Sequence, residues 1–463
     1  MKIVVVGGGI AGLATAYYLQ ERAHRDNRPL EYVLVESSPA LGGKIVSSHE
    51  SGFVVEGGPD SFITQKTIAL DLSRALGVGD DLIGTNDPAR QVFVWSRGQL
   101  RKMPEGVMLI IPTRLMPFIR SSLISWPGKL RMGMDAMIPP RRDHGDESLA
   151  HFVRRRLGSE ALDRIAEPMV AGIYVADAED LSLKSTFPRF LDMEDKYGSL
   201  LRGIIAQKRA SNGHKTTSST SMFMTLRGGL QELVDAIVSK LEPGSLLLNR
   251  TVTAVACEGD GYAIGLSDQT HLHADAVVLA TPAYASADLI QKIDPALASL
   301  LRSIRYVSTA TVSLGYKKSQ VAHSLQGFGF VVPRSEHRKI MACTWSSTKF
   351  NYRAPEGHVL IRAFIGGSQA EHLAEQDEES LAQMARKELA AMMGITAVPV
   401  ITKVYRWHKA NPQYSVGHQE RVAQIEQAVR RQPNLNLVGS AYHGVGIPDC
   451  IQDGLRAAEQ VLA

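Results

Sequence analysis

Three glycines follow the first apolar run of the chain at the spacing of a dinucleotide-binding turn. Gly7, Gly9 and Gly12 form the pattern G-x-G-x-x-G directly after residues 3–6, and Glu36 ends the next apolar run. Such glycines let backbone N–H groups and a helix N-terminus approach a pyrophosphate, while a carboxylate at Glu36 accepts hydrogen bonds from ribose hydroxyls. The carboxylate would repel a 2′-phosphate, so the pattern disfavours NADP. The alternative is a plain glycine turn before a helix.

Two further glycine-rich loops favour FAD over NAD. Gly42-Gly43-Lys44 and the run 57–62 both come soon after the second apolar run. A domain that binds only NAD has no use for these loops, whereas FAD has a ribityl chain and a three-ring isoalloxazine to hold. Lys44 is explained equally well as an exposed loop lysine and as a residue beside the flavin.

A second glycine-rich loop that leads into a helix lies near the C-terminal end of the chain. Gly444 and Gly446 can lie flat against a planar ligand, Pro448 fixes the entry to a helix, and Asp449 with Gln452 forms a capping pair. A helix N-terminus aimed at the N1–C2=O edge of a flavin stabilises negative charge there. The neighbouring cysteine, at position 450, is expected to be a buried bystander.

The elements that position these motifs alternate between strand and helix. A βαβ unit is predicted over 3–6, 10–22 and 32–35, followed by a helix over 66–76. A β-meander precedes a buried strand at 276–280, and a last strand near 434–439 precedes a helix that ends at Val461. Because nucleotide-binding signals lie at both ends of the chain, the domain that carries them must be discontinuous.

The middle of the chain has a different character. A hairpin with Arg97-Gly98 at its turn is predicted, and five prolines break 106–140 into short helical pieces. Helices are predicted over 148–157, 159–171 and 379–393, and a glycine-rich entrance precedes another helix within 226–241. The polar run 208–221 is predicted to be a flexible surface loop.

Composition sets limits on the class of protein. The 463 residues suit two or three domains, and 44% apolar with 21% charged residues is ordinary for a globular protein. The net charge of +4 is small and spread, which argues against nucleic acid as a partner. Three scattered cysteines form no disulfide framework or metal spacing and suggest a reducing compartment. No run of about 18 apolar residues spans a membrane, so we expect a cytoplasmic protein.

The motifs together carry a family resemblance that covers nearly the whole chain in order. They are GGGIAGL, LGGK, GGPDSF, GIYVAD with LSLKSTFP, RWHKANPQYSVGH and GVGIPDCIQDG. This set resembles the FAD-dependent protoporphyrinogen and coproporphyrinogen oxidases of haem synthesis. GxGIPDCI and GIYxxD are the most specific of these motifs, whereas the wider amine oxidase and phytoene desaturase superfamily shares the N-terminal glycines.

The resemblance implies an α/β fold of three parts. They are an FAD-binding Rossmann-like domain (1–86, 222–292 and 403–463), an inserted α+β substrate domain (87–110, 199–221 and 293–402) and a helical domain (111–198). The helical domain is membrane-associated in some members of the family. Because arginines interrupt its apolar face here, we expect weak membrane contact or none and prefer a helical cap over the cleft.

The motifs and the resemblance predict one set of residues for FAD and another for the substrate, with no metal site. Arg101 matches a position that binds a propionate in related enzymes, and Lys66 can reach the same mouth. Phe328, Phe330 and Trp345 are candidates for the walls around a macrocycle, though a core role is as well supported. The predicted FAD contacts are Gly7, Gly9, Ile10, Ala11, Gly12, Glu36, Ser37, Gly42, Gly43, Lys44, Gly57, Gly58, Pro59, Asp60, Ser61, Val252, Ala280, Trp407, Gly439, Gly446, Ile447 and Pro448.

The implied reaction removes six electrons and six protons from a porphyrinogen in three flavin cycles, with oxygen as acceptor and hydrogen peroxide as product. Hydride transfer to flavin N5 needs no assigned protein base, and His408 and His443 are expected to be structural. His443 also departs from the small or acidic residue expected before GVG. Hand-off to a later enzyme of the haem pathway is an expectation, and monomer and homodimer both remain open.

Several functions stay open at this point. The mild basic excess and the absence of a membrane segment favour coproporphyrinogen III, with four propionates, over protoporphyrinogen IX, with two. An amine oxidase of the same fold usually carries a Gly-Glu-His run near its C-terminus, which this chain lacks. A flavin-bearing porphyrin carrier without turnover is the alternative from another class.

Overall fold

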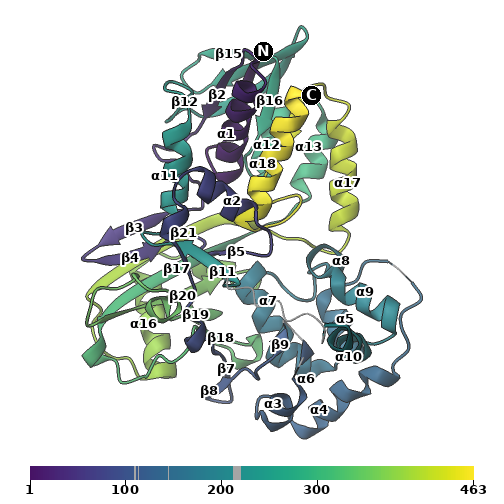
Figure 1. The fold of residues 1–463 in the computed structure, drawn as a ribbon, viewed down its shortest axis with the longest axis vertical. Helices are drawn as coiled ribbons and strands as arrows, with labels where there is room; N and C mark the ends of the chain where they lie inside the picture. The colour runs from purple at the N-terminus through teal and green to yellow at the C-terminus, as the bar shows by residue number, and fades with distance from the viewer. Residues whose placement is uncertain (109–110, 113, 144, 212–220) are drawn as a thin grey trace.

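A five-stranded sheet, a seven-stranded sheet and a cluster of short helices organise the chain (Figure 1). The structure is a computed structural model, and it describes residues 1–463 apart from 109–110, 113, 144 and 212–220. Both termini belong to the part built on the five-stranded sheet, and most of the middle of the sequence forms the other two parts.

The five-stranded sheet is parallel throughout. In β1, Ile3 and Val5 enter one hydrophobic core while Val4 and Val6 enter another. A strand buried on both faces has a continuous apolar sequence, which is why this run shows no polar alternation. The strand order is β12 (Leu246–Leu247), β2 (Glu31–Val35), β1 (Lys2–Val6), β16 (Ala276–Leu279) and β22 (Leu435–Leu437).

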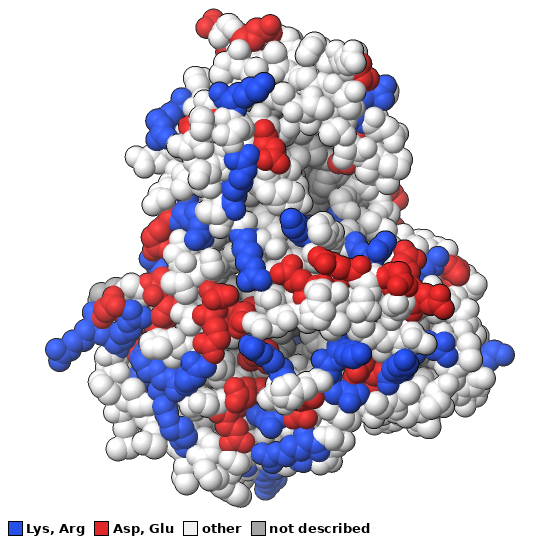
Figure 2. Space-filling view, turned by 180° about the vertical axis from the view of Figure 1, so that it is seen from behind, with Lys and Arg blue, Asp and Glu red and all other residues white. Residues whose placement is uncertain are grey.

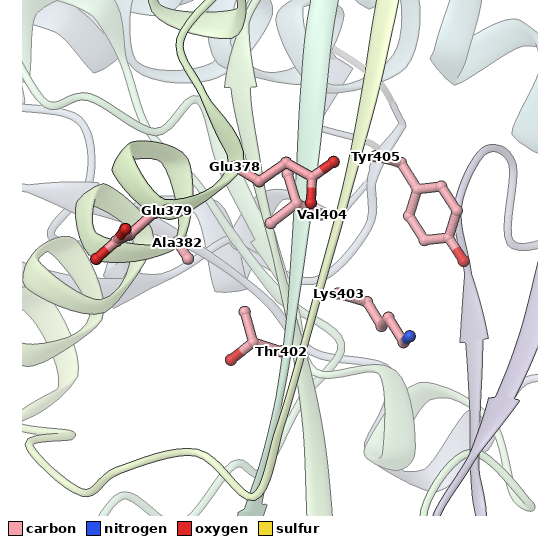
Figure 3. A pocket seen from close by; sticks show the side chains of 7 residues that line it. All are labelled: Glu378, Glu379, Ala382, Thr402, Lys403, Val404 and Tyr405. Atoms are coloured by element: carbon pink, nitrogen blue, oxygen red, sulfur yellow. The ribbon is translucent and has the colours of Figure 1, made fainter.

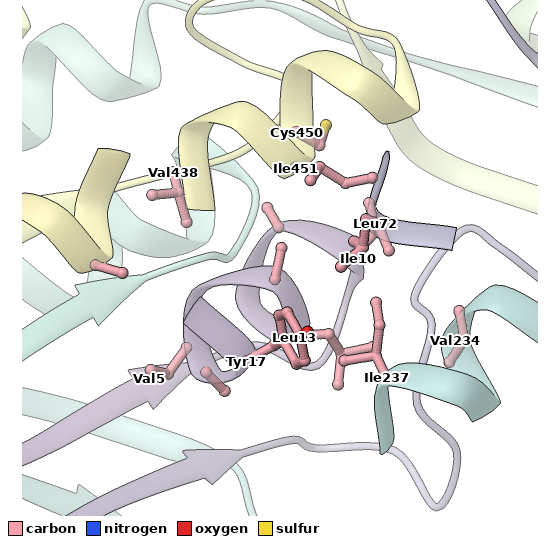
Figure 4. Packing of buried hydrophobic residues seen from close by; sticks show 14 of the residues in the cluster. Val5, Ile10, Leu13, Tyr17, Leu72, Val234, Ile237, Val438, Cys450 and Ile451 are labelled. Carbon is pink, nitrogen blue, oxygen red and sulfur yellow. The ribbon is translucent and has the colours of Figure 1, made fainter. Parts of the chain in front are cut away.

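Four helices contribute to the core on one face of this sheet, and Figure 4 shows side chains from them packed together. Two of these helices begin at the glycine motifs. Helices α1 and α18 pack closely because a Cβ at Gly454 would lie 2.7 Å from the Ala11 carbonyl oxygen. This contact places the first and last motifs of the chain side by side. The four helices are α1 (Ile10–Arg25), α2 (Ile68–Ala75), α11 (Gln231–Lys240) and α18 (Ile447–Leu462).

The opposite face packs against a β-meander and three helices. The meander follows the predicted order of strands and turns, and its last connection leads into β16. These elements share the second core of the parallel sheet. They are β13 (Val252–Glu258), β14 (Gly261–Leu266), β15 (His271–Ala274), α12 (Ala283–Ile290), α13 (Pro295–Arg302) and α17 (His418–Val429).

The seven-stranded sheet is antiparallel except where β18 pairs with β7. Helix α16 (Glu378–Met393) packs against it and shares its core. Its strand order is β21 (Ile401–Pro412), β17 (Tyr306–Lys317), β20 (His358–Gly366), β19 (Ala342–Thr344), β18 (Gly329–Val331), β7 (Val92–Ser96) and β8 (Gln99–Lys102). Two smaller sheets consist of β3 (Ser47–Glu50) with β4 (Phe53–Glu56), and of β5 (Phe62–Ile63), β11 (Phe223–Leu226) and β6 (Leu82–Gly84).

The helical cluster has its own core, and a buried ion pair lies inside it. Arg156 and Asp135 are both fully buried, with a nitrogen–oxygen distance of 2.6 Å. A π-helical turn at Leu162–Ala166 separates α6 from α7, so the helix predicted over 159–171 is interrupted by an irregular segment. The helices are α3 (Leu115–Arg120), α4 (Trp126–Gly133), α5 (Leu149–Arg156), α6 (Ser159–Ala161), α7 (Glu167–Tyr174), α8 (Leu183–Thr186), α9 (Pro188–Tyr197) and α10 (Leu200–Ser211).

Two local predictions are wrong. The start of 106–140 contains two short antiparallel strands, β9 (Val107–Met108) and β10 (Ile111–Pro112), and a proline is compatible with a short strand of this kind. Residues 208–211 end helix α10, since Lys, Arg and Ala are good helix formers. The rest of that predicted loop, 212–220, lies outside the described residues.

The strand pairing and the hydrophobic cores place two segments in other parts of the molecule than the predicted domain boundaries do. Strand β21 pairs with β17 along most of its length, so 403–412 lies in the seven-stranded sheet and not with the last segment of the FAD domain. Leu200 and Ile204 of α10 belong to the core of the helical cluster. The three-domain division itself stays a prediction.

The surface carries mixed charge. Figure 2 shows Lys and Arg interspersed with Asp and Glu over the face that it displays. Within the described ranges, no helix combines the length and the apolarity that a membrane crossing requires. The same residues hold no cluster of three His, Cys, Asp or Glu side chains that could bind a metal ion.

Candidate active site

The N-terminus of α1 is left open. Its N-cap, Gly9, makes no side-chain capping bond, and no acidic residue lies in the first turn. Among the described residues, none accepts a hydrogen bond from the N–H groups of Ile10, Ala11 or Gly12. A Cβ at Gly12 would lie 2.0 Å from the Gly7 carbonyl oxygen, so only glycine fits there. These free donors and the positive end of the helix dipole suit a pyrophosphate.

Glu36 lies beside this turn at the end of β2. Its Oε2 accepts a hydrogen bond of 2.6 Å from the Gly8 N–H, and its Oε1 accepts one of 2.8 Å from the Ser38 N–H. The Ser37 hydroxyl also donates to Oε1 at 3.2 Å. A carboxylate has about four lone-pair sites, so Glu36 is held in place and keeps capacity for ribose hydroxyls.

The carboxyl ends of the parallel strands meet at one edge, as the Rossmann arrangement requires. Gly7 follows β1, Glu36 follows β2, Ala280 follows β16 and Gly439 follows β22 after one residue. A Cβ at Gly7 would lie 3.0 Å from the Ala280 carbonyl oxygen, so these strand ends are in direct contact. Val252, on β13, is buried in the second core instead, which leaves backbone atoms for any contact with a ligand.

The glycine loops pack backbone against backbone in one line. The Gly42 N–H donates to the Gly8 carbonyl at 2.8 Å, and a Cβ at Gly43 would lie 3.0 Å from the Gly9 Cα. A Cβ at Gly58 would lie 1.8 Å from the Lys44 carbonyl oxygen. The line therefore runs from the α1 N-terminus through the 42–44 turn to the 57–61 loop. It matches the order of pyrophosphate, ribityl chain and ring system in FAD.

Lys44 links the line of glycine loops to two segments near the C-terminal end of the chain. Its Nζ donates to the Ala410 carbonyl at 2.8 Å and to the Ser440 hydroxyl at 3.2 Å. Desolvation lowers the pKa of Lys44, although its side chain keeps exposed surface. Because its Nζ is held by two protein oxygens, Lys44 is not an ordinary surface lysine. We use the term recess for the region bounded by Lys44, the glycine loops and the N-termini of α1 and α18.

The 57–61 loop is tied to the seven-stranded sheet. The Trp407 indole Nε1 donates to the Gly57 carbonyl at 2.9 Å, and Lys349 forms an ion pair of 2.8 Å with Asp60. Burial alone would raise the pKa of Asp60, but Lys349 and Arg362 outweigh it and lower that pKa to about 2. These contacts hold the backbone of the loop in place, and Lys349 neutralises the charge of Asp60.

The N-terminus of α18 lies near the N-terminus of α1, but unlike α1 it has a side chain in its first turn that caps the helix. The N-cap is Gly446, and Asp449 in the first turn accepts from the Gly446 N–H at 3.1 Å. The predicted pair of Asp449 with Gln452 is therefore corrected, because the N-cap is Gly446, three residues before Asp449. Burial raises the pKa of Cys450 to about 12, which fits a protonated bystander.

The candidate substrate residues are dispersed. Lys66 forms an ion pair with Asp449 at the α18 N-terminus. Arg101 lies on β8, at the opposite edge of the sheet from β21, and donates to the Ser122 hydroxyl at 2.8 Å. The structure brings Lys66 to the recess and places Arg101 at the junction with the helical cluster.

The predicted aromatic walls need correction at two of three positions. Phe330 is 2% exposed and Trp345 is fully buried, and both belong to the core of the seven-stranded sheet. Trp345 packs against Phe93 and His323. Because neighbours in the core occupy their faces, neither ring is free to contact a macrocycle. Phe328 is partly exposed and remains a candidate.

Some residues at the site escaped the sequence-based prediction. Thr311, Lys349 and Arg362 contact the 57–61 loop, but single polar residues in strands and short helices give no local pattern. Tyr174 ends α7, and burial together with Asp449 raises its pKa to about 12. Its electrostatic link to Asp449 puts α7 near the α18 N-terminus, and the GIYxxD motif was the available signal.

Of the two histidines that the sequence predicts to be structural, His408 is exposed on β21 and His443 makes structural contacts. His443 lies between Glu426 and Asp453, at 2.8 Å and 3.2 Å, and the hydrogen bond to Asp453 raises its pKa. His418 is buried and stacks on Tyr414, and burial lowers its pKa to about 4. Both ring nitrogens of His443 are held by carboxylates, whereas those of His418 are buried without a hydrogen-bond partner among the described residues.

One defined pocket lies elsewhere (Figure 3). It has a volume of about 440 Å³ and lies between the N-terminus of α16 and β21. Its lining contains none of the predicted cofactor or substrate residues. The lining residues are Glu378, Glu379, Ala382, Thr402, Lys403, Val404 and Tyr405.

Comparisons with known proteins agree with this geometry. The family model described as flavin containing amine oxidoreductase matches residues 10–462. The Bacillus subtilis (strain 168) protein named coproporphyrinogen III oxidase is 36% identical over 462 residues, covering 99% of this chain and 97% of that protein. Its namesake from Propionibacterium freudenreichii subsp. freudenreichii is 38% identical over 492 residues, covering 99% and 90%. A crystal structure from Exiguobacterium sp. 255-15 has a TM-score of 0.88 and 33% identity, covering 99% of this chain and 98% of that one.

Proposed function

The chain belongs to the flavin-containing amine oxidoreductase family, and from this premise we propose that it oxidises coproporphyrinogen III to coproporphyrin III. It is an FAD-dependent oxidoreductase, and the open α1 N-terminus, Glu36 and the line of glycine loops fit that cofactor. The observation that carries the proposal is the likeness, along nearly the whole chain, to proteins named for this reaction. The α18 N-terminus, with its Gly446 cap beside the recess, supports it from the structure.

The proposed reaction is balanced with oxygen as the acceptor. Coproporphyrinogen III loses six electrons and six protons, and three O₂ become three H₂O₂. FAD, when bound, supplies the two-electron chemistry. The chain's own task is to hold the macrocycle against the ring system, and aromatisation of the macrocycle favours the product. No protein base is assigned, and the contacts of His443 are in keeping with that.

Cations near the recess would bind propionates. Lys66 is 59% exposed and lies at the α18 N-terminus, where its partner Asp449 is mostly buried. An exposed ammonium beside a buried carboxylate can keep this contact and still meet a propionate from the solvent side. Arg101 would bind a second propionate if the substrate extends toward the helical cluster. Cytoplasmic location and passage of the product to a later haem-pathway enzyme complete the proposal.

The test is anaerobic mixing of the holoprotein with coproporphyrinogen III and, separately, with protoporphyrinogen IX. We expect each productive substrate to bleach the yellow flavin band and porphyrin fluorescence to follow when oxygen is admitted. Faster bleaching by coproporphyrinogen III supports the proposal, whereas faster bleaching by protoporphyrinogen IX replaces the substrate. The same substrates without protein control for spontaneous oxidation. A holoprotein that neither substrate bleaches contradicts the proposal, and bleaching by amines would then support an amine oxidase.

A further inference from the structure

The carbonyl oxygen of Gly57 accepts three hydrogen bonds from one sheet. Thr311 on β17 donates its hydroxyl at 3.0 Å, Arg362 on β20 donates at 2.8 Å, and Trp407 on β21 donates its indole N–H at 2.9 Å. These strands are consecutive in the order β21, β17, β20. A carbonyl oxygen has two lone pairs, so three donors exceed its ordinary complement. We call these three side chains the carbonyl clamp.

Arg362 is the unusual member of the clamp. It is 3% exposed, and its second contact is with the Gly58 carbonyl at 2.6 Å. Within the described ranges, no carboxylate oxygen lies within 4.0 Å of its guanidinium, and its buried Nε has no acceptor. Burial lowers the pKa of Arg362, although Asp60 and Glu56 oppose the effect from farther away. A buried cation without a close counter-ion is costly, so the two carbonyls are its main partners.

The clamp fixes the direction of the next N–H group. No peptide bond among the described residues is cis, so the Gly58 N–H points opposite to the Gly57 carbonyl. The carbonyl faces the seven-stranded sheet, and the N–H therefore faces away from it. None of the described residues accepts a hydrogen bond from this N–H. Donors on a carbonyl polarise its amide and make the N–H a stronger donor.

The free N–H belongs to the line of glycine loops. Gly58 touches the Lys44 carbonyl, where an added Cβ would lie at 1.8 Å, and Gly43 in turn touches Gly9 at the start of α1. The unpartnered donors of α1, at the other end of this line, were assigned above to the pyrophosphate. The Gly58 N–H therefore occupies the end where the ring system of the same cofactor would lie.

We propose that the carbonyl clamp of Thr311, Arg362 and Trp407 positions and polarises the Gly57–Gly58 peptide so that the Gly58 N–H donates to the acceptor edge of the FAD ring system. The three side chains act through the peptide and are positioning residues. The inserted sheet, which carries no glycine motif, thereby takes part in cofactor binding. The inference rests on FAD as the cofactor and not on the identity of the substrate.

Thr311→Val tests the proposal with little change in shape. The matched control is Thr309→Val, which removes a hydroxyl two residues away on the same face of β17, where Thr309 only accepts from Asn411. Losing one hydrogen bond should weaken FAD binding to the apoprotein about fivefold in Thr311→Val, and the control should bind as the wild type does. The flavin midpoint potential should fall in Thr311→Val only, while the melting temperatures of the two apoproteins should stay alike.

A structural role would give a different pattern. If Thr311→Val lowers only the melting temperature of the apoprotein and leaves FAD affinity and potential unchanged, the proposal is overturned. It is overturned equally if Thr309→Val changes affinity and potential as much as Thr311→Val does. Neither readout needs a porphyrinogen, so failure here is distinguishable from failure of the proposed reaction.

Arg362→Lys and Arg362→Met sharpen the test. Lysine keeps a charge and a donor, so FAD affinity should follow the order wild type, Lys, Met, with partial rescue by lysine. Because Arg362→Met removes the donor to the Gly58 carbonyl and one of the three donors to the Gly57 carbonyl, its apoprotein should also melt at a lower temperature. Equal FAD affinity in the Lys and Met variants would show that charge and donation at this point do not matter, and would overturn the role of Arg362.

Discussion

The two helices that begin at glycine loops, α1 and α18, lie side by side (Figure 1). Their N-termini carry different charge. The first turn of α1 holds no acidic residue, and its N-cap makes no side-chain bond. The first turn of α18 holds Asp449, which caps Gly446 and pairs with Lys66. One helix therefore keeps its full positive end, and the other has its positive end offset by a carboxylate.

This difference fits the two ends of one cofactor. A pyrophosphate brings formal negative charge and benefits from an unopposed helix dipole. A flavin ring is neutral when oxidised, so a strong positive field is not needed to bind it, and a moderate field affects only the charge that appears on reduction. The Asp449–Lys66 pair would set that moderate field. Substitutions at each helix should therefore have distinct effects.

The largest effect is expected at α1. In Gly12→Ala the new Cβ would lie 2.0 Å from the Gly7 carbonyl oxygen, so the turn must move away from the pyrophosphate position. Overpacking of this size should weaken FAD binding by about a hundredfold, and the protein should be purified colourless. Absorbance at the flavin band relative to protein measures it. Gly133→Ala is the control, since nothing lies within 4 Å of its added Cβ. A fully yellow Gly12→Ala protein would contradict the assignment.

At α18 the expected effect is on potential more than on affinity. Asp449→Asn keeps an oxygen that can cap Gly446, removes the negative charge and leaves Lys66 unpaired. The helix end then becomes more positive, so the flavin midpoint potential should rise while FAD affinity changes less than about fivefold. A redox titration of the holoprotein measures the shift. Glu459→Gln, near the other end of the same helix, should leave the potential unchanged, and a fall in Asp449→Asn would refute the comparison.

The same contrast explains what the sequence could predict. Contacts made by backbone need glycine where a side chain would collide, and Gly12 and Gly58 show this directly with carbonyl oxygens at 2.0 Å and 1.8 Å from an added Cβ. Such glycines leave a pattern with fixed spacing, so the βαβ unit and the start of α1 were predicted and the structure has them. The prediction of FAD agrees with the family model, whereas the start of α18 was predicted with the wrong capping pair. The fold class is confirmed by the structural neighbour at full length.

Contacts made by single side chains leave no such pattern. Thr311 and Arg362 are 51 positions apart in the sequence and meet only because β17 and β20 are neighbours in the sheet. A lone polar residue in an apolar strand is not distinguishable in sequence from one that faces solvent. The prediction that Trp345 lines the substrate was wrong because aromatic residues are common both in hydrophobic cores and in ligand-binding walls, and the sequence does not distinguish the two.

Arg101 remains a prediction that kinetics can decide. If it binds a propionate, Arg101→Ala should raise KM for coproporphyrinogen III about tenfold with little change in kcat, since a charged hydrogen bond is lost in binding. Lys102→Ala is the control, because that exposed side chain points to the other face of β8. Steady-state oxygen uptake measures both variants. An unchanged KM would remove Arg101 from the site and leave Lys66 as the candidate cation.

The smallest effect concerns stability and lies away from both helix starts. Burial, helped by Asp177, raises the pKa of Glu167 to about 7, while the Arg334 N–H opposes the shift. The native state therefore binds more protons than the unfolded state between pH 4.5 and 7, and the free energy of unfolding should fall as pH rises through that window. Glu167→Gln should flatten this decline by about 1 kcal/mol, with solvent screening taken into account. Urea unfolding of the holoprotein at several pH values measures it. Exposed Glu21→Gln should keep the wild-type slope, and an equally steep decline in Glu167→Gln would assign the pH dependence to other groups.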